Sequence, residues 1–151
     1  MGRSVRASAS AAIIERVTYT YDNAGNRRTV TENNGDVTTW TYDNANQLTV
    51  EQRSGSSAYT TTYTYDDVGN RATMVDGTGT TTYAYNAGNR LTLITDPDST
   101  LTTNTYDNNG NLTVTDDNGT VTTNTWIYDN RLRTVTLATP ATTTFTYDGD
   151  G

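Results

Sequence analysis

Two pairs of adjacent aspartates carry the side chains best suited to act as general acid and base. Asp66 and Asp67 form the first pair, and Asp116 and Asp117 form the second. A glycosidase holds two carboxyl groups about 5–10 Å apart on either side of one bond, whereas neighbouring residues of a strand face opposite sides. Both pairs also fall in turn-like sequence, and no other reactive group converges on them. We therefore expect no catalytic residues and no enzymatic activity.

The composition excludes most other reactive sites, because the sequence contains neither histidine nor cysteine. Cysteine nucleophiles, histidine-based triads and the usual zinc and iron–sulfur sites are thereby ruled out. The segment Gly77-Thr78-Gly79 lacks the third glycine and the following helix of a phosphate-binding loop. No cofactor is expected. The formal net charge of -7 and the scattered arginines also argue against a nucleic-acid partner.

A regular series of Asp and Asn residues, each directly after a tyrosine, recurs at intervals of 19 to 23 residues. Their oxygen atoms would suit Ca²⁺, but each turn supplies only one or two acidic groups and no glutamate at ligand spacing. An Asp or Asn that begins a turn instead accepts a hydrogen bond from the backbone N–H two residues later. We favour this turn role and expect no metal site. The predicted turn residues are Asp22, Asp43, Asp66, Asn86, Asp107, Asp129 and Asp148.

The tyrosines before these residues belong to a tandem repeat of about 21 residues that fills the chain from Val17 onwards. A second aromatic residue usually stands two positions earlier, and side chains two apart share one face of a strand. Threonine, with 36 residues the most frequent type, fills most of the alternate positions. The pattern predicts half-buried strands with an aromatic inner face. The predicted aromatic ladder consists of Tyr19, Tyr21, Trp40, Tyr42, Tyr63, Tyr65, Tyr83, Tyr85, Tyr106, Trp126, Tyr128, Phe145 and Tyr147.

A second strand follows in each repeat, where apolar residues such as Leu48 and Val50 alternate with threonine. The same alternation occurs in residues 91–93 and 112–114, and Asn-Gly or Asp-Gly pairs punctuate the chain as hairpin signals. The sequence therefore predicts an all-β fold: an antiparallel meander of tandem β-hairpins with thirteen or fourteen strands. Because open twisted sheets rarely exceed about ten strands, we expect this one to curl or spiral.

The organisation of the chain follows from the extent of the repeat. Residues 1–16 are expected to form a leader, either a short helix or a disordered segment, since their Ala/Ser composition makes a poor signal peptide. Residues 17–151 are expected to form seven repeats, cut off in an eighth turn. No apolar run is long enough to span a membrane as a helix.

Three segments carry a resemblance to a known family: residues 19–27, 63–71 and 106–113, which read YTYDNAGNR, YTYDDVGNR and YDNNGNLT. They resemble the YD repeat of the RHS family, which includes Rhs proteins, insecticidal toxin-complex C components and teneurins. The resemblance implies a β-sheet strip that spirals into a hollow shell in long members, and an extracellular or cell-surface location. Some repeats depart from the motif, as where Asn46 follows Ala45 without a glycine. We expect tighter or altered turns there.

Three functions remain open at the level of sequence. The leading hypothesis is a structural YD-repeat segment that builds part of an extracellular shell, stalk or surface wall, with no catalysis of its own. The first alternative is a carbohydrate-binding or adhesion module that uses exposed tyrosines. The second is a filament subunit that self-associates through open edge strands. The expected partners are accordingly other copies, the remaining repeats of a longer parent chain, or a carbohydrate.

Overall fold

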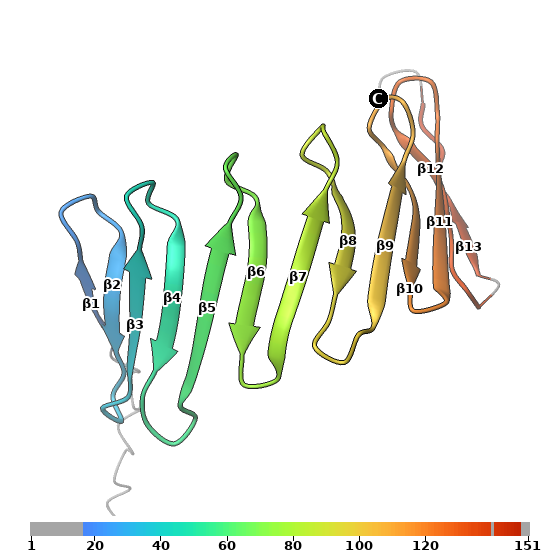
Figure 1. The fold of residues 1–151 in the computed structure, drawn as a ribbon. Helices are drawn as coiled ribbons and strands as arrows, with labels where there is room; N and C mark the ends of the chain where they lie inside the picture. Colours follow the sequence, from blue (N-terminus) through green and yellow to red (C-terminus); the bar gives the residue numbers. More distant parts are fainter. Residues whose placement is uncertain (1–16, 140, 149–151) are drawn as a thin grey trace, which may run out of the picture.

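The computed structural model describes residues 17–139 and 141–148, so the predicted leader lies outside the described residues. The described residues form 13 strands in one sheet, and each strand pairs antiparallel with its neighbours in sequence (Figure 1). The predicted all-β meander of hairpins is therefore confirmed. None of the described segments is a helix able to cross a membrane. The strands are β1 (Thr18–Tyr21), β2 (Arg27–Thr31), β3 (Val37–Tyr42), β4 (Leu48–Arg53), β5 (Tyr59–Tyr65), β6 (Arg71–Asp76), β7 (Gly79–Tyr85), β8 (Leu91–Thr95), β9 (Leu101–Tyr106), β10 (Leu112–Asp117), β11 (Thr120–Trp126), β12 (Leu132–Thr136) and β13 (Thr142–Thr144).

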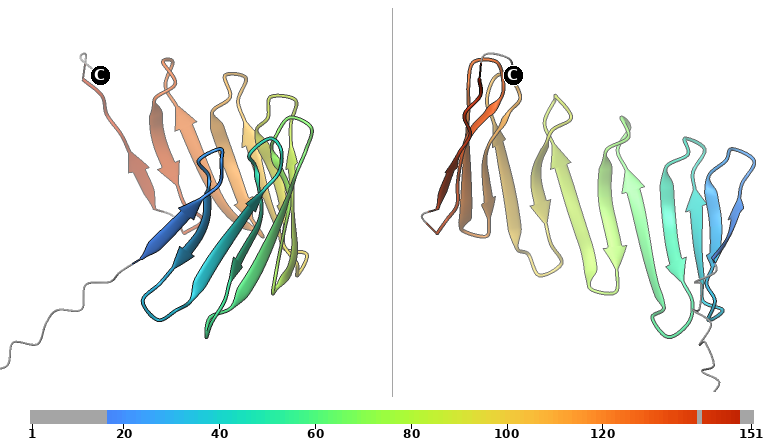
Figure 2. Two further views of the ribbon diagram at one scale, coloured as in Figure 1. Left: turned by 90° about the vertical axis from the view of Figure 1, so that its left-hand side faces the viewer. Right: turned by 180° about the vertical axis from the view of Figure 1, so that it is seen from behind.

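The sheet is a single twisted layer that stays open. The strand order runs from β1 to β13 without a crossover, and the two end strands do not pair with each other. Figure 2 shows that the strands turn progressively along the sheet, so the layer curves without closing. This curvature follows from the twist between adjacent strands, which accumulates over a long meander. Within the described residues, no second layer covers either face.

A β-bulge recurs in every described hairpin that closes at the upper edge of the sheet in Figure 1. In the β3–β4 hairpin, Thr41 pairs with Val50 and Tyr42 with Leu48, so Thr49 has no residue opposite it. The extra residue shifts the side-chain parity by one. Leu48 therefore lies beside Tyr42 on the face that carries the aromatic side chains, here called the ring face. Val50 lies on the opposite face, although its two-residue spacing from Leu48 would place both on one face of a strand without a bulge.

Threonine stabilises these bulges in two ways. Where the extra residue is a threonine, its hydroxyl donates to a backbone carbonyl across the hairpin, at 3.1 Å from Thr49 to Thr41. Where the extra residue is Ala72, the next residue is Thr73, whose hydroxyl lies 2.7 Å from that of Thr64. The first arrangement occurs at Thr49, Thr92 and Thr113, and the second at Thr29, Thr73 and Thr134.

The ring face is the less exposed of the two faces. Along β9, for example, Tyr106 is half-buried whereas the adjacent Thr105 is exposed. The described residues that are buried are few, namely Val30, Thr38 and Thr81, and all three lie on the ring face. Most of the apolar burial is therefore shared among partly covered side chains.

Substitution of Val30 tests how much the few buried side chains contribute to the free energy of unfolding. We expect Val30→Ala to lower the free energy of unfolding by about 1–3 kcal/mol, because Val30 is the buried hydrophobic side chain of the described residues. The matched control Val68→Ala removes the same atoms from a side chain that is 67% exposed, and should change stability by less than about 0.5 kcal/mol. Urea denaturation of both variants measures the difference. Equal losses would show that the ring face contributes no core.

Candidate functional site at the contacts between repeats

Six turns at the upper edge share one backbone conformation in the described residues. In the first, the Asp22 N–H donates to the Asn26 carbonyl at 2.9 Å, and the Gly25 N–H donates to the Asp22 carbonyl at 3.2 Å. The fourth residue always has a positive φ, which is 90° at Gly25 and 61° at Asn46. Glycine and asparagine are the residues that adopt this conformation most readily. The turn at Asn46 is therefore not tighter, because asparagine replaces glycine at the same position.

A carboxylate lies at the first position of four of these turns, and the amide of Asn86 takes that position in a fifth. Asp66 Oδ1 accepts hydrogen bonds from the backbone N–H of Val68 at 3.1 Å and of Asn70 at 2.8 Å. The Asn70 side chain donates to Asp66 Oδ2 at 3.0 Å. This side-chain bond, with the backbone bonds, holds the pKa of Asp66 below its ordinary value. Equivalent backbone contacts are made by Asp22, Asp43, Asn86 and Asp107.

The sixth turn differs from the sequence-based alignment. Trp126 pairs with Leu132 across the hairpin bulge, the place that a repeat tyrosine takes elsewhere. Ile127 is then the first turn residue, and its N–H donates to the Arg131 carbonyl at 2.9 Å. Tyr128 is pushed into the turn and is fully exposed. Asp129 forms an ion pair with Arg131, and this contact lowers the Asp129 pKa.

The last predicted turn residue, Asp148, begins a segment that continues beyond the described residues. The remaining ladder members lie at two positions of the repeat, two residues apart, and Trp126 takes the second of them, not the first that its spacing before Tyr128 predicts. The first position holds Tyr19, Trp40, Tyr63, Tyr83 and Phe145, and the second holds Tyr21, Tyr42, Tyr65, Tyr85, Tyr106, Trp126 and Tyr147.

Five of the seven side chains at the second position donate a hydrogen bond to the preceding repeat. The Tyr65 hydroxyl donates to the Leu48 carbonyl at 2.8 Å, and Tyr106 donates to the Leu91 carbonyl at 2.8 Å. Tyr42 and Tyr147 make the same contact, at 2.9 and 2.8 Å. At Trp126 the indole N–H takes the place of the tyrosine hydroxyl and donates to the Leu112 carbonyl at 2.9 Å. The acceptor is always the first residue of the preceding repeat's second strand.

A second set of contacts joins neighbouring turns along the upper edge. The side-chain amide of Asn26 donates to Asn46 Oδ1 at 2.9 Å, and that of Asn111 donates to Asn130 Oδ1 at 2.9 Å. A third such pair joins residues 70 and 89 at 3.3 Å. Between these pairs, longer side chains bridge the turns, as where Gln47 Nε2 donates to the Gly69 carbonyl at 3.4 Å. The turn contacts therefore alternate with a period of two hairpins.

Arginines add a third set of contacts by lying over the rings. The Arg71 guanidinium is 4.9 Å from the Tyr63 ring centroid and 5.7 Å from that of Tyr83 in the next repeat. Arg131 lies 4.4 Å from the Tyr147 ring. Such cation–π contacts contribute about 0.5–1 kcal/mol at exposed sites. They also explain how a leucine-poor chain keeps its rings partly covered. Further pairs are Arg27 with Trp40 and Arg90 with Tyr106.

The paired aspartates do not converge on a shared point. Asp116 pairs with Thr103 and Asp117 with Thr102 on β9, so the two carboxylates leave opposite faces of β10. Asp66 and Asp67 lie in the third upper turn. Among the described residues, no group of three acidic side chains is placed to hold a metal ion. The dense contacts of this chain instead run from repeat to repeat.

The tyrosine contact predicts a graded loss of stability. Tyr65→Phe removes one hydrogen bond to Leu48 and should cost about 1 kcal/mol. Tyr65→Ala also removes the ring and should cost about 3–5 kcal/mol. The control Tyr128→Ala truncates a fully exposed ring and should change stability by less than about 0.5 kcal/mol. Denaturant unfolding provides the values, and a Tyr65→Ala loss below about 1 kcal/mol would contradict this account.

The turn carboxylates predict acid sensitivity. Side-chain bonds from Asn26, Asn70 and Asn111 lower the pKa of Asp22, Asp66 and Asp107 in the folded state. A lowered folded pKa stabilises the fold above the unfolded value of about 3.9, and this contribution is lost as the pH falls through the folded pKa. Thermal unfolding should therefore shift to lower temperature below about pH 4.

Variants of one turn separate charge from hydrogen bonding. Asp66→Asn keeps the Oδ1 acceptor that Asn86 uses naturally, so its melting temperature should depend less on acid than that of the parent. Asp66→Ala loses the acceptor as well and should melt at a lower temperature at every pH. Identical acid profiles for the parent and for a triple Asp22, Asp66 and Asp107 to Asn variant would refute the assignment.

The chain is similar to one protein family by sequence and to several solved structures by fold. The RHS-repeat family model matches residues 21–58 and 85–121. No curated protein matches the chain by sequence. A crystal structure of TcdB2-TccC3 without its hypervariable C-terminal region is 21% identical, with a TM-score of 0.68 over 83% of this chain and 7% of that chain. A Photorhabdus luminescens Tc holotoxin pore structure is 17% identical, with a TM-score of 0.62 over 91% of this chain and 11% of that chain.

These structural likenesses establish a shared fold, and this chain spans less than about an eighth of either chain. The family model adds the sequence evidence, because its two matches begin at Tyr21 and Tyr85, the tyrosines that open two of the upper turns. The chain belongs to the RHS-repeat family.

Proposed function

We propose that this chain is a structural YD-repeat segment that forms part of an extracellular or cell-surface β-sheet wall and has no catalysis of its own. The proposal rests on one observation: the polar side chains of this chain bind mainly between one repeat and the next. The tyrosine hydroxyls, turn amides and arginines contact the neighbouring repeat. A wall needs such contacts at each step, because every hairpin must hold the next one.

The size of the related chains supports a wall longer than this segment. The chain aligns with only 7% of the TcdB2-TccC3 chain, with the same fold. An array of equivalent hairpins can be lengthened without changing its internal contacts. We infer that this segment is one stretch of such an array and that the remaining repeats of a parent chain, or other copies, adjoin its end strands.

Deleting one complete two-hairpin unit tests the proposal. Removing residues 66–106 joins Tyr65 to Asp107 and restores a Tyr-Asp turn. Because the unit begins and ends at equivalent points, we expect the shortened chain to fold, with a β-sheet circular dichroism spectrum and a modestly lower melting temperature. The control deletion of residues 66–95 removes three strands instead of four, so it joins the upper end of β5 to the lower-edge turn at Asp96, and should unfold. A wall account fails if both deletions unfold the chain.

A carbohydrate-binding role remains the second candidate, since Tyr21 is 59% exposed and Tyr19 lies beside it with ring centroids 6.5 Å apart. A glycan array distinguishes the two. The wall proposal expects no binding, whereas retention on a defined glycan that is lost in Tyr19→Ala would favour adhesion. Self-assembly through the end strands is the third candidate, and a mass that rises with concentration in light scattering would favour it.

A further inference from the structure

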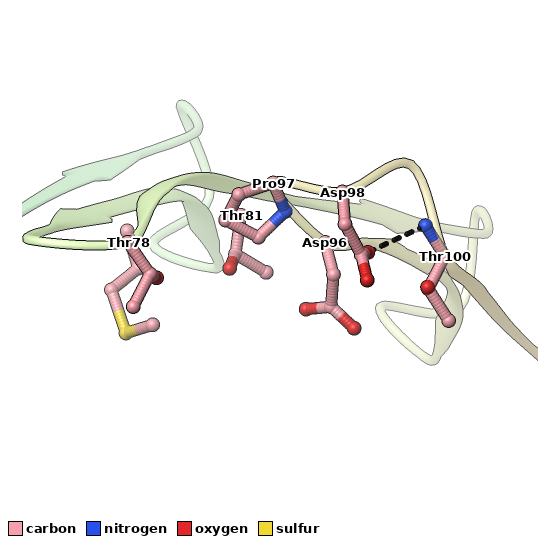
Figure 3. Close-up of a pocket in the computed structure, with 7 residues that line it drawn as sticks. Thr78, Thr81, Asp96, Pro97, Asp98 and Thr100 are labelled. Atoms are coloured by element: carbon pink, nitrogen blue, oxygen red, sulfur yellow. Dashed lines mark hydrogen bonds between the residues drawn. The ribbon is translucent and has the colours of Figure 1, made fainter.

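A hollow of about 630 Å³ opens on the ring face at the lower edge of the sheet. It lies between the β6–β7 turn and the β8–β9 turn, and Thr78, Thr81, Asp96, Pro97 and Thr100 contribute to its wall. The two turns are closely packed, because a Cβ placed on Gly79 would lie 2.8 Å from Pro97 Cβ. Figure 3 shows the Thr81 hydroxyl and the Asp96 carboxylate directed to the same side of the ribbon.

Two polar groups of this hollow have no partner in the part of the chain that the structure describes. Thr81 is only 6% exposed, yet its hydroxyl makes no hydrogen bond with any described residue. The Asp96 carboxylate likewise makes no hydrogen bond or ion pair there, although its backbone N–H closes the turn. A buried polar group such as that of Thr81 usually has a partner, whereas Asp96 is half-buried and its carboxylate can be reached from the hollow. The hollow therefore offers a ligand the hydroxyl of Thr81 and the negatively charged carboxylate of Asp96.

The chain contains an equivalent turn, residues 32–36, in which an arginine pairs with the acidic side chains. The Glu32 N–H donates to the Asp36 carbonyl at 2.9 Å, as the Asp96 N–H donates to the Thr100 carbonyl at 2.9 Å. In the first turn, the guanidinium of Arg53 pairs with Glu32 and Asp36. That arginine stands opposite Thr38 on β3.

The turn at residues 96–100 has no arginine at the position that corresponds to Arg53. The residue opposite Thr102, in the place that corresponds to Arg53, is Asp117. The sequence contains no basic residue between Arg90 and Arg131, and both of these lie in upper turns. The lower edge around the hollow is thus acidic without a basic side chain. Its acidic residues are Asp76, Asp96, Asp98, Asp116 and Asp117.

We propose that this Asp96 hollow binds a guanidinium group, supplied by an arginine side chain of a partner polypeptide. Asp96 would accept the charged N–H groups, as Glu32 does from Arg53, and the Thr81 hydroxyl would accept a further one. Arginine favours such sites because its planar fork donates to a carboxylate through two bonds. The proposal does not depend on the wall function.

Titration of the full 151-residue chain, followed by NMR of the threonine methyl groups, tests the proposal. The probe is the peptide acetyl-Gly-Arg-Gly-amide, and its citrulline analogue is the uncharged control. We expect saturable shifts at Thr81 and Thr100 with the arginine peptide and at least a ten-fold weaker response with citrulline. Methylguanidinium separates the sources: binding ten-fold weaker than the peptide supports a polypeptide arginine, whereas equal or tighter binding overturns the polypeptide assignment.

Three variants locate the binding. Asp96→Asn should weaken the peptide at least ten-fold, and Thr81→Val about three-fold or more. Asp116→Asn removes the same charge from the opposite face of the sheet and should change the affinity less than two-fold. Equal losses in Asp96→Asn and Asp116→Asn would reduce the effect to general electrostatics and overturn the proposal. Saturable shifts at Thr81 with calcium chloride or maltose, in place of the peptide, would also overturn it.

Discussion

The structure depends on one constraint: a single-layer sheet has no opposing layer against which to bury its apolar side chains. Folded domains normally cover the apolar face of a sheet with helices or a second sheet. Here the described residues offer only Val30 as a buried hydrophobic side chain. The fold must therefore be stabilised along the sheet, by contacts that each hairpin makes with the next one. This explains why the chain is rich in tyrosine and threonine, whose side chains combine apolar contact with a hydrogen-bonding group.

The contacts along the sheet are of three kinds, and each uses a different part of the hairpin. Tyrosine hydroxyls reach a carbonyl of the preceding repeat at the base of the turn. Asparagine side chains pair at the turn tips, and arginines cover rings between neighbouring strands. The bulge in every upper hairpin brings these groups into register, because it shifts the second strand by one residue before it meets the next repeat. The alternation of Gly and Asn in the turns then makes two hairpins, rather than one, the unit that repeats.

Much of this arrangement follows from sequence reasoning, and the exceptions have physical causes. The two-residue spacing of Tyr63 and Tyr65 predicts a shared face, and the position of Asp66 predicts its bond to the turn backbone, as the structure has them. The bulge escapes prediction because it inserts a residue without changing the alternation of leucine and threonine on either side. The Tyr65 contact escapes because its acceptor is a backbone carbonyl, which no sequence pattern marks. At Tyr128, the Tyr-Asp pair looks like every other repeat, yet Trp126 takes the strand position because a tryptophan N–H can reach the same carbonyl.

The central claim is that each hairpin is held by its neighbours and not by a common core. Amide hydrogen exchange measured residue by residue tests this directly, since strands of such an array open from the ends. The account predicts that protection rises stepwise from β1 and β13 towards β6 and β7, with the strands of one hairpin sharing a similar value. Uniform protection from β2 to β12, equal to the free energy of global unfolding, would contradict it and indicate a single cooperative core.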